Sequence, residues 1–436
     1  MKNSAERMIE IGREMSPREK AWLVALDKDV AGLWRIADSL DELGLLAQTA
    51  GAEVRGRTVC RRHAPHPATF IGRGKAEEIA ALCRENDADL VIFDDDLTPA
   101  QLRNLQDLIG LKIIDRTELI LDIFARRART SEAQLQIEMA QLQYLLPRLA
   151  GKGVELSQLG GGIGTRGPGE TKLEADRRRI RDRIHNLKKE LERIRRHRHL
   201  QRRQRRDAGI PTISIVGYTN SGKSTLFNAL TSAVVLIEDK LFATLDPTTR
   251  KAALPSGREV LFSDTVGFIQ NLPHHLIDSF RATLEEVLEA DLLLMVLDLS
   301  QKAFWDRMKA VEKVLSELEA SDKPRLFVLN KIDLVEDEFW ANEIAARLED
   351  SVVISARERI GLEKLVERID FLLAASLRCY RFLIPQSRPD LIASLHQKGK
   401  VLKIDYHRDL VYVEVVLSQP AGDRLKEYLV VNNPGG

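Results

Sequence analysis

Residues 217–225 read G-Y-T-N-S-G-K-S-T and follow directly on the apolar run Ile213-Ser214-Ile215-Val216. The segment fits the phosphate-binding pattern G-x-x-x-x-G-K-[ST], in which a strand leads into a glycine-rich loop and then into a helix. Glycines allow a tight turn whose backbone N–H groups point inward, and the following helix presents its positive end to phosphate. The sequence therefore predicts a nucleoside triphosphate site.

Individual residues of this loop have separate expected roles. We expect Lys223 to reach the β- and γ-phosphates and the Ser224 hydroxyl to ligate Mg²⁺. The remaining loop residues that we expect around the nucleotide are Gly217, Tyr218, Thr219, Asn220, Ser221, Gly222 and Thr225. The pattern alone identifies neither the base nor the purpose of binding, and short patterns also match by chance.

A second motif, Asn330-Lys331-Ile332-Asp333, follows the apolar run 326–329 and indicates the base. A carboxylate at Asp333 can accept hydrogen bonds from both N1–H and the 2-amino group of guanine. Adenine lacks the 2-amino group and would leave the carboxylate unpaired, a difference on the order of 10⁴-fold in favourable sites. The motif therefore favours GTP over ATP.

Two shorter motifs complete the expected site. Asp264-Thr265-Val266-Gly267 follows the run 260–262; Asp264 suits Mg²⁺ through a water, and the Gly267 N–H can sense the γ-phosphate. Ser355-Ala356-Arg357 follows the run 352–354, where backbone amides could contact the guanine oxygen. All four motifs lie at the carboxyl ends of predicted strands, where an open α/β sheet binds its ligands.

These motifs resemble those of the translation-factor class of GTPases. The segment 242–249, F-A-T-L-D-P-T-T, is similar to the switch of the Obg and HflX GTPases, and we expect Thr244 to bind Mg²⁺ in the GTP state. Phe242, Ala243, Leu245 and Asp246 are expected beside the nucleotide. Thr248 and Thr249 are alternatives, or are turn or strand-entry residues after Pro247. The expected catalytic residues are Lys223, Thr244 and Gly267.

Phe268 departs from the pattern of many small GTPases, which carry a glutamine there to orient the attacking water. One interpretation is that Phe268 is simply a core residue. The other is that hydrolysis is slow until a partner completes the site.

Length and composition set the broad class. A chain of 436 residues predicts two to four domains, and its net charge is +1. The cysteines Cys60, Cys83 and Cys379 form no C-x-x-C pair, which argues against a zinc site or a disulfide framework. The apolar run 292–297 is too short to cross a membrane. We expect a cytoplasmic, monomeric protein that requires no membrane.

The expected fold is α/β and multidomain. Its parts are an N-terminal α/β domain (1–130), a basic coiled-coil hairpin with a Gly-rich loop (131–207), a P-loop GTPase domain with a doubly wound parallel sheet (208–376) and a small C-terminal α+β domain (377–436). In the N-terminal part we expect strands at 22–26, 53–60, 90–93 and 111–114, and helices at 38–50, 75–85 and 99–109. In the C-terminal part we expect strands at 380–385, 399–405 and 410–417 and a covering helix at 421–429.

The hairpin is predicted from apolar spacing. Leu135, Met139, Leu142 and Leu146 form one a/d seam; a second runs through Leu173, Ile180, Ile184, Leu187, Leu191 and Ile194. The connecting loop contains a G-x-G-x-x-G at 162–167, but no strand precedes it, so we reject a dinucleotide site.

From residue 176 to residue 206 the second helix carries fifteen Lys or Arg against four acids. Such a helix face can be merely solvated, but the excess of one sign favours a polyanion, and structured RNA is the natural one. Arg73-Gly74-Lys75 could hold a phosphate before a helix or form a simple turn. The candidate RNA contacts are Arg73, Lys75, Arg166, Arg177, Arg178 and Arg181.

The order of domains, the stretch 161–178 (G-G-I-G-T-R-G-P-G-E-T-K-L-E-A-D-R-R) and the D-T-V-G-F motif resemble the HflX family of ribosome-associated GTPases. The resemblance implies Mg²⁺-dependent GTP hydrolysis stimulated by the ribosome, binding to the large ribosomal subunit or the 70S particle, and a role in splitting stalled or idle ribosomes under stress. The resemblance also suggests that the N-terminal region binds ATP, but that region contains no motif for a second nucleotide site. Two other classes stay open: a signalling GTPase with a protein partner, and an assembly factor that uses GTP only as a bound ligand.

Overall fold

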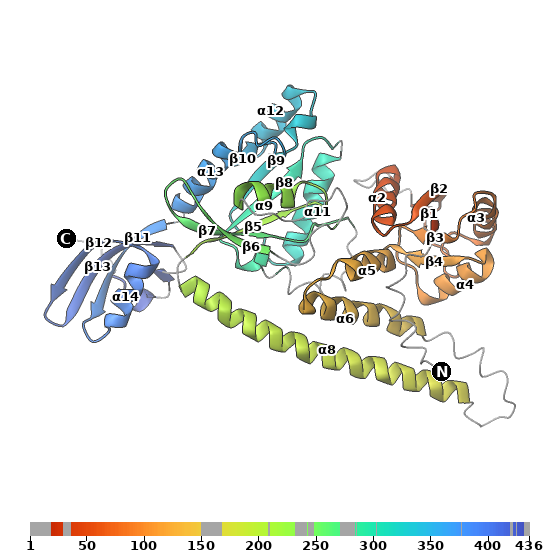
Figure 1. Cartoon of the computed structure of the whole chain (residues 1–436), viewed down its shortest axis with the longest axis horizontal. Coiled ribbons are helices and arrows are strands. Elements are labelled where there is room, and N and C mark those ends of the chain that lie inside the picture. The colour runs from red at the N-terminus through yellow and green to blue at the C-terminus, as the bar shows by residue number, and fades with distance from the viewer. Residues whose placement is uncertain are drawn as a thin grey trace.

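The structure is a computed structural model of the chain. It describes residues 19–28, 36–149, 168–207, 210–231, 242, 248–270, 284, 286–301, 303–375, 377–418, 422–423 and 425–430. Four regions follow one another along the chain, coloured from red to blue in Figure 1.

The N-terminal domain is a parallel sheet with helices on both faces. Its elements are β1 (Lys20–Asp27), α2 (Ile36–Thr49), β2 (Glu53–Arg61), α3 (Arg73–Glu85), β3 (Leu90–Phe93), α4 (Pro99–Ile109), β4 (Lys112–Asp115) and α5 (Arg116–Arg127). The strand order is β2-β1-β3-β4. Because side chains alternate along a strand, Leu23 and Ala25 of β1 pack towards α2 and α5, whereas Trp22 and Val24 pack towards α3 and α4.

The strands and helices expected in this domain are confirmed, apart from shifts of a few residues at their ends. Helix α4 begins with a capping box between Thr98 and Gln101 and ends at Gly110, whose φ of 75° suits glycine. Helix α5 was not expected. It follows β4 without a loop, because Asp115 both ends the strand and caps the helix by accepting from the Glu118 N–H at 3.0 Å.

Helices α6 (Ser131–Arg148) and α8 (Pro168–Asp207) form the predicted helical pair, with α8 running past α6 in Figure 1. On α8, Leu187 is fully buried, and the other described seam residues are half-buried. Arg183 of α8 holds Glu138 of α6 with two hydrogen bonds, of 2.7 and 2.8 Å. Helix α6 also has an apolar face that was not expected, and it packs on the N-terminal domain through Ala133, Ile137, Ala140 and Tyr144.

The third region is a six-stranded sheet with helices on both faces. Its elements are β5 (Thr212–Gly217), α9 (Lys223–Thr231), β6 (Thr248–Ala253), β7 (Glu259–Asp264), β8 (Leu292–Asp298), α11 (Phe304–Glu317), β9 (Arg325–Asn330), η3 (Ile332–Leu334), α12 (Glu338–Arg347), β10 (Ser351–Val353) and α13 (Leu362–Ala375). The strand order is β10-β9-β8-β5-β7-β6. All pairs are parallel except β6 with β7, so the sheet is mixed at one edge. Thr248 and Thr249 begin β6, as one of the interpretations expected.

The C-terminal domain is an antiparallel sheet with a helix on one face. Its elements are β11 (Leu377–Pro385), α14 (Pro389–Lys398), β12 (Lys400–His407), β13 (Leu410–Ser418) and the 3₁₀ turn η4 (Lys426–Tyr428). The three strands are confirmed, and α14 was not expected. The helix expected at 421–429 is present at Gly422 and Asp423 but does not continue through 425–430, where a short 3₁₀ turn precedes a bridge between Leu429 and Phe382. That bridge uses backbone groups that a continuing helix would have paired internally.

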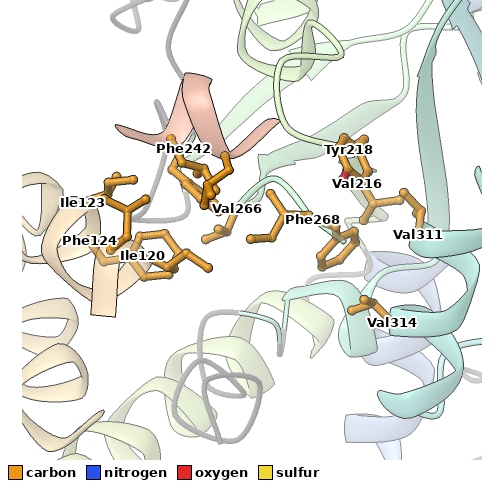
Figure 2. Close-up of a cluster of buried hydrophobic side chains, with 14 of the residues drawn as sticks. Ile120, Ile123, Phe124, Val216, Tyr218, Phe242, Val266, Phe268, Val311 and Val314 are labelled. Carbon is orange, nitrogen blue, oxygen red and sulfur yellow. The ribbon is translucent and has the colours of Figure 1, made fainter. Parts of the chain in front are cut away.

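One apolar cluster joins the N-terminal domain to the third region. Figure 2 shows side chains of α5, among them Phe124, on one side and Val311 and Val314 of α11 on the other, with Val266 and Phe268 between them. The rings of Phe124 and Phe242 meet edge to face, with centroids 4.6 Å apart. The two regions therefore share a core instead of being joined only by a linker.

Among the residues that the structure describes, no helix combines the length and the apolar character needed to cross a membrane.

Candidate functional site

The glycine-rich loop lies at the carboxyl end of β5, the strand between β8 and β7, as the motif predicts. Gly222 has a φ of +95°, which allows the turn into α9. A Cβ at Gly222 would lie 2.2 Å from Nδ2 of Asn330, so the loop and the second motif are in direct contact. The hydroxyls of Thr219 and Ser221 are buried and have no hydrogen-bond partner among the described residues. Buried polar groups normally have a partner, so such hydroxyls fit a site that receives a polar ligand.

Lys223, the first residue of α9, is buried with its ammonium group inside the loop. Its Nζ donates to the backbone oxygen of Tyr218 at 2.6 Å. Burial lowers the pKa of Lys223 to about 8, although the nearby Asp264 carboxylate acts in the opposite direction. A triphosphate would supply the negative charge that this buried cation lacks.

Ser224 and Asp264 are brought together as the Mg²⁺ hypothesis requires. The Ser224 hydroxyl donates to Oδ2 of Asp264 at 2.8 Å, and Asp264 is fully buried at the end of β7. Adjacent hydroxyl and carboxylate oxygens are ligands that Mg²⁺ prefers, so these residues fit the ion. The neighbouring Thr265 has a structural role, because its hydroxyl donates to the Ile215 oxygen of β5 at 2.7 Å.

The segment after Asp264 is hydrogen-bonded to the start of the glycine-rich loop. The Phe268 N–H donates to the Gly217 oxygen at 3.1 Å, and the Thr219 N–H donates to the Phe268 oxygen at 2.7 Å. A Cβ at Gly267 would lie 2.9 Å from both Nζ of Lys223 and Cα of Thr219, so only glycine allows this approach.

The Phe268 side chain is only 2 % exposed and belongs to the apolar cluster of Figure 2. Its position is therefore that of a core residue, which is compatible with both interpretations. An apolar ring in this place has no group that could orient a water molecule.

The expected base-binding motifs also converge. Asn330 links them, since its Nδ2 donates to the Ser221 oxygen at 2.8 Å and its Oδ1 accepts from the Ala356 N–H at 2.9 Å. Lys331 has a φ of 67° and pairs at 2.9 Å with Asp298, a partner that no motif indicates. The Ser355 hydroxyl accepts from the Glu358 N–H at 3.1 Å, which shapes the loop after β10.

Asp333 is the second residue of η3. Its side chain is exposed, so a guanine base could reach it. Arg357 is exposed at the same edge of the sheet and is paired with Glu358 at 3.8 Å.

Other expected site residues are not all gathered at the loop. Phe242 is described, but its side chain packs on Phe124 of the N-terminal domain, and Val266 lies in the same apolar cluster (Figure 2). The remaining switch residues, Ala243, Thr244, Leu245 and Asp246, lie outside the described residues.

The candidate RNA contacts have mixed environments. Arg178 and Arg181 are exposed on α8, and Arg177 is half-buried. Arg73 and Lys75 form the first turn of α3 and pair with Glu77 and Glu78 of the same helix, at 2.9 and 2.6 Å. Arg166 and the Gly-rich loop lie outside the described residues.

Sequence reasoning missed the residues that the N-terminal domain places against the loop. Glu42 of α2 accepts a hydrogen bond from the Tyr218 hydroxyl, across 176 positions in the chain. The local signal is a charged residue inside the apolar face of α2, between Leu40 and Leu43, and it does not identify the partner.

Comparisons with known proteins cover nearly the whole chain. Three family models match consecutive parts of it: "GTP-binding GTPase N-terminal" (37–125), "GTP-binding GTPase Middle Region" (127–205) and "50S ribosome-binding GTPase" (212–331). The chain is 48% identical over 423 residues to GTPase HflX of Caldanaerobacter subterraneus, covering 97% of this chain and 96% of that protein. It is 44% identical over 367 residues to GTPase HflX of Escherichia coli, covering 84% and 86% of the two chains. A solved GTP-binding protein of Sulfolobus solfataricus, in complex with GDP, is 27% identical, with coverage of 81% and 98% and a TM-score of 0.43.

Proposed function

We propose a function from one premise: the chain belongs to the HflX family of GTPases. It therefore binds and hydrolyses GTP. We infer that hydrolysis is coupled to binding of the large ribosomal subunit. The observation that carries this inference is the match of residues 212–331 to a family described as 50S ribosome-binding GTPases.

We propose the following roles for the site residues, and the contacts around Lys223, Ser224 and Gly267 support them. Lys223 and the loop N–H groups hold the β- and γ-phosphates, and Asp333 accepts from guanine. Ser224 would hold Mg²⁺ directly and Asp264 would hold it through water, and the bound ion would neutralise charge on the phosphate oxygens. Gly267 senses the γ-phosphate through its N–H, and we propose Thr244 as the switch residue that completes the Mg²⁺ site.

The basic face of α8 supports RNA as the contacted surface. Between 174 and 196, where the structure describes the side chains, the helix carries ten Lys or Arg and five acids. Arg183 is engaged by Glu138, whereas Arg178 and Arg181 lie off the seam and are exposed. Unbalanced positive charge on an exposed helix attracts phosphate without reading base sequence.

Salt dependence tests this surface. Binding to 50S subunits in a pelleting assay is expected to weaken steeply between roughly 50 and 200 mM salt, as counterion release requires. Arg178→Ala with Arg181→Ala should reduce the salt slope by about one for each phosphate that is no longer neutralised. The control is Arg347→Ala, an exposed arginine of α12 that pairs within its own helix. Binding that does not depend on salt, or that survives RNase treatment, would indicate that α8 contacts a protein and not RNA.

The buried Phe268 supports slow hydrolysis in the free protein. Since a phenylalanine ring cannot orient water, we propose that the ribosome completes the site. Single-turnover GTP hydrolysis with 50S subunits is expected to exceed the rate of the free chain by orders of magnitude. Equal rates with and without subunits would refute the coupling.

The finer proposal is that the protein separates stalled or idle 70S ribosomes during stress. The proposed place of action is the cytoplasm, and the proposed acting form is a monomer. Sucrose gradients of 70S particles with the protein and GTP, GDP or a non-hydrolysable analogue test this directly. Free 30S and 50S peaks with GTP or the analogue, but not with GDP, are expected; intact 70S in all three would exclude splitting.

A further inference from the structure

The Tyr218 side chain connects the phosphate loop to the N-terminal domain. Tyr218 is the second residue of the loop and is only 3 % exposed. Its hydroxyl donates to Oε1 of Glu42, on α2, and accepts from the Gln270 N–H at 2.8 Å. One hydroxyl group thus joins the loop, the end of the segment that carries Gly267, and a second domain.

The Glu42 carboxylate is fixed by a buried arginine. Arg116, the first residue of α5, is 2 % exposed and donates through Nη2 to Oε2 of Glu42. Its Nη1 donates to Oδ1 of Asp94 at 2.6 Å, and Nη2 also reaches the Gln270 oxygen at 3.3 Å. Gln270 is therefore held by both of its backbone polar groups, one through Tyr218 and one through Arg116.

Removing one partner from such a buried cluster is strongly destabilising, because it leaves another polar or charged group without compensation. Two carboxylates face one guanidinium, and the Tyr218 hydroxyl supplies a further donor to Glu42. Burial raises the pKa of the Tyr218 hydroxyl, so this group stays protonated and remains the donor. The guanidinium of Arg307 of α11 lies 5.1 Å from the centre of the Tyr218 ring, on the side of the third region.

The backbone of Tyr218 lies within the nucleotide site itself. Its backbone oxygen accepts a hydrogen bond from Nζ of Lys223. The N–H of the next residue, Thr219, donates a hydrogen bond to the backbone oxygen of Phe268. A shift of Tyr218 would move both the lysine and the segment that carries Gly267. The hydroxyl contact is therefore placed to act on phosphate binding.

We propose that Glu42 and Arg116 are positioning residues for the GTP site, which hold the phosphate loop and the Gly267 segment in register through Tyr218 and Gln270. Docking of the N-terminal domain then preorganises the nucleotide site. This inference rests on GTP binding alone and not on the ribosome, so its tests use the free full-length chain.

The first test compares two identical chemical changes. Tyr218→Phe removes only the bridging hydroxyl. Tyr144→Phe is the matched control, because its buried hydroxyl also bonds to carboxylates, those of Asp115 and Glu118, which belong to the N-terminal domain. Dissociation of a fluorescent GDP analogue is expected to be about tenfold or more faster in Tyr218→Phe, as removal of a hydrogen bond to a charged group implies. The GDP dissociation rate should change less than about twofold in Tyr144→Phe, even if both variants have a lower melting temperature.

The second test asks whether Glu42 acts through Tyr218. Glu42→Ala should weaken GDP binding, and Glu42→Gln, which keeps an acceptor oxygen, should restore part of it. The combined Tyr218→Phe and Glu42→Ala variant should be no weaker than the worse single variant, because both changes remove one shared contact. If Glu42→Ala does not fold, Glu42→Gln takes its place. The loss of GDP affinity in the Glu42→Gln and Tyr218→Phe double variant is then compared with the sum of the losses in the two single variants.

Two outcomes would overturn the proposal. One is an equal change of the GDP dissociation rate in Tyr218→Phe and Tyr144→Phe, including no change in either. The other is an additive decrease of GDP affinity in the double variant. In either case the cluster would only stabilise the domain interface. The separate proposal that the ribosome stimulates GTP hydrolysis would not be affected.

Discussion

Gly222→Ala tests the contact between the phosphate loop and the second motif. The added Cβ would meet Nδ2 of Asn330 at 2.2 Å, a distance that no side chain tolerates, and the φ of +95° adds backbone strain. To relieve the clash the Asn330 amide must move. That movement breaks its bond to the Ser221 oxygen and its bond from the Ala356 N–H.

The magnitude follows from these two bonds. Each broken bond that leaves a buried group unsatisfied costs about 1–3 kcal/mol, and the left-handed φ costs roughly 1–2 kcal/mol more. Breaking both bonds therefore costs on the order of 3 kcal/mol, which corresponds to about a hundredfold weaker GDP binding.

The control for backbone strain is Gly257→Ala, in the turn between β6 and β7. Gly257 has a similar φ of +80°, but a Cβ there meets no atom within 4 Å. Titration of fluorescent GDP into both variants, beside thermal melting, separates the two effects. We expect about a hundredfold lower affinity in Gly222→Ala and nearly unchanged affinity in Gly257→Ala. GDP affinities of the two variants within about threefold of each other would refute the argument.

Three further predictions concern single groups. Burial, aided by the nearby Asp115 carboxylate, raises the pKa of Glu118 from 4.5 to about 7, so folding favours its protonated form and stability falls as pH rises through 4.5 to 7. Glu118→Gln should therefore be more stable than the parent at a pH of about 8.5, by up to about 3 kcal/mol, and lose this advantage near a pH of about 5 in urea melts; a constant difference across pH would contradict this. Asp333→Asn should weaken GTP at least ~100-fold and improve binding of xanthosine triphosphate in competition titrations, since the amide donates where the carboxylate accepted; unchanged preference would remove Asp333 from the base site. Cys379 is exposed, although partial burial and the neighbouring Glu414 raise its pKa, whereas Cys60 and Cys83 are buried with pKa values raised to about 11. A thiol reagent near neutral pH should therefore label Cys379 faster than the other two, which react only after unfolding; equal labelling rates would contradict this.

Much of the fold could be predicted because its signals are local. A buried strand shows as a short apolar run, and Pro99 and Gly110 mark the two ends of α4. Helix α5 could not be separated from β4 by the same reasoning, because no turn residue stands between them and Asp115 serves both elements. Helix α14 does carry a local start signal, Pro389, at its first turn.

The helix expected at 421–429 shows the limit of local reasoning in the other direction. Its residues include good helix formers, and Gly422 and Asp423 are helical, yet Leu429 is bridged to Phe382 of β11 and residues 426–428 make only a 3₁₀ turn. Packing on the sheet outweighs a propensity of a few tenths of a kcal/mol per residue, roughly the scale of these preferences.

By itself, the sequence determined where the phosphate loop, the Asp264 segment and the motif 330–333 fall, because each is a short run after a strand. Parallel strands bring such runs to one edge of a sheet whatever else the chain does. Only the tertiary structure decided that Phe242 and Phe268 belong to the core between two domains and that the Tyr218 hydroxyl donates to Glu42. Those contacts join residues far apart in the chain, and no spacing, period or neighbouring residue in the sequence encodes which distant side chains will be buried together.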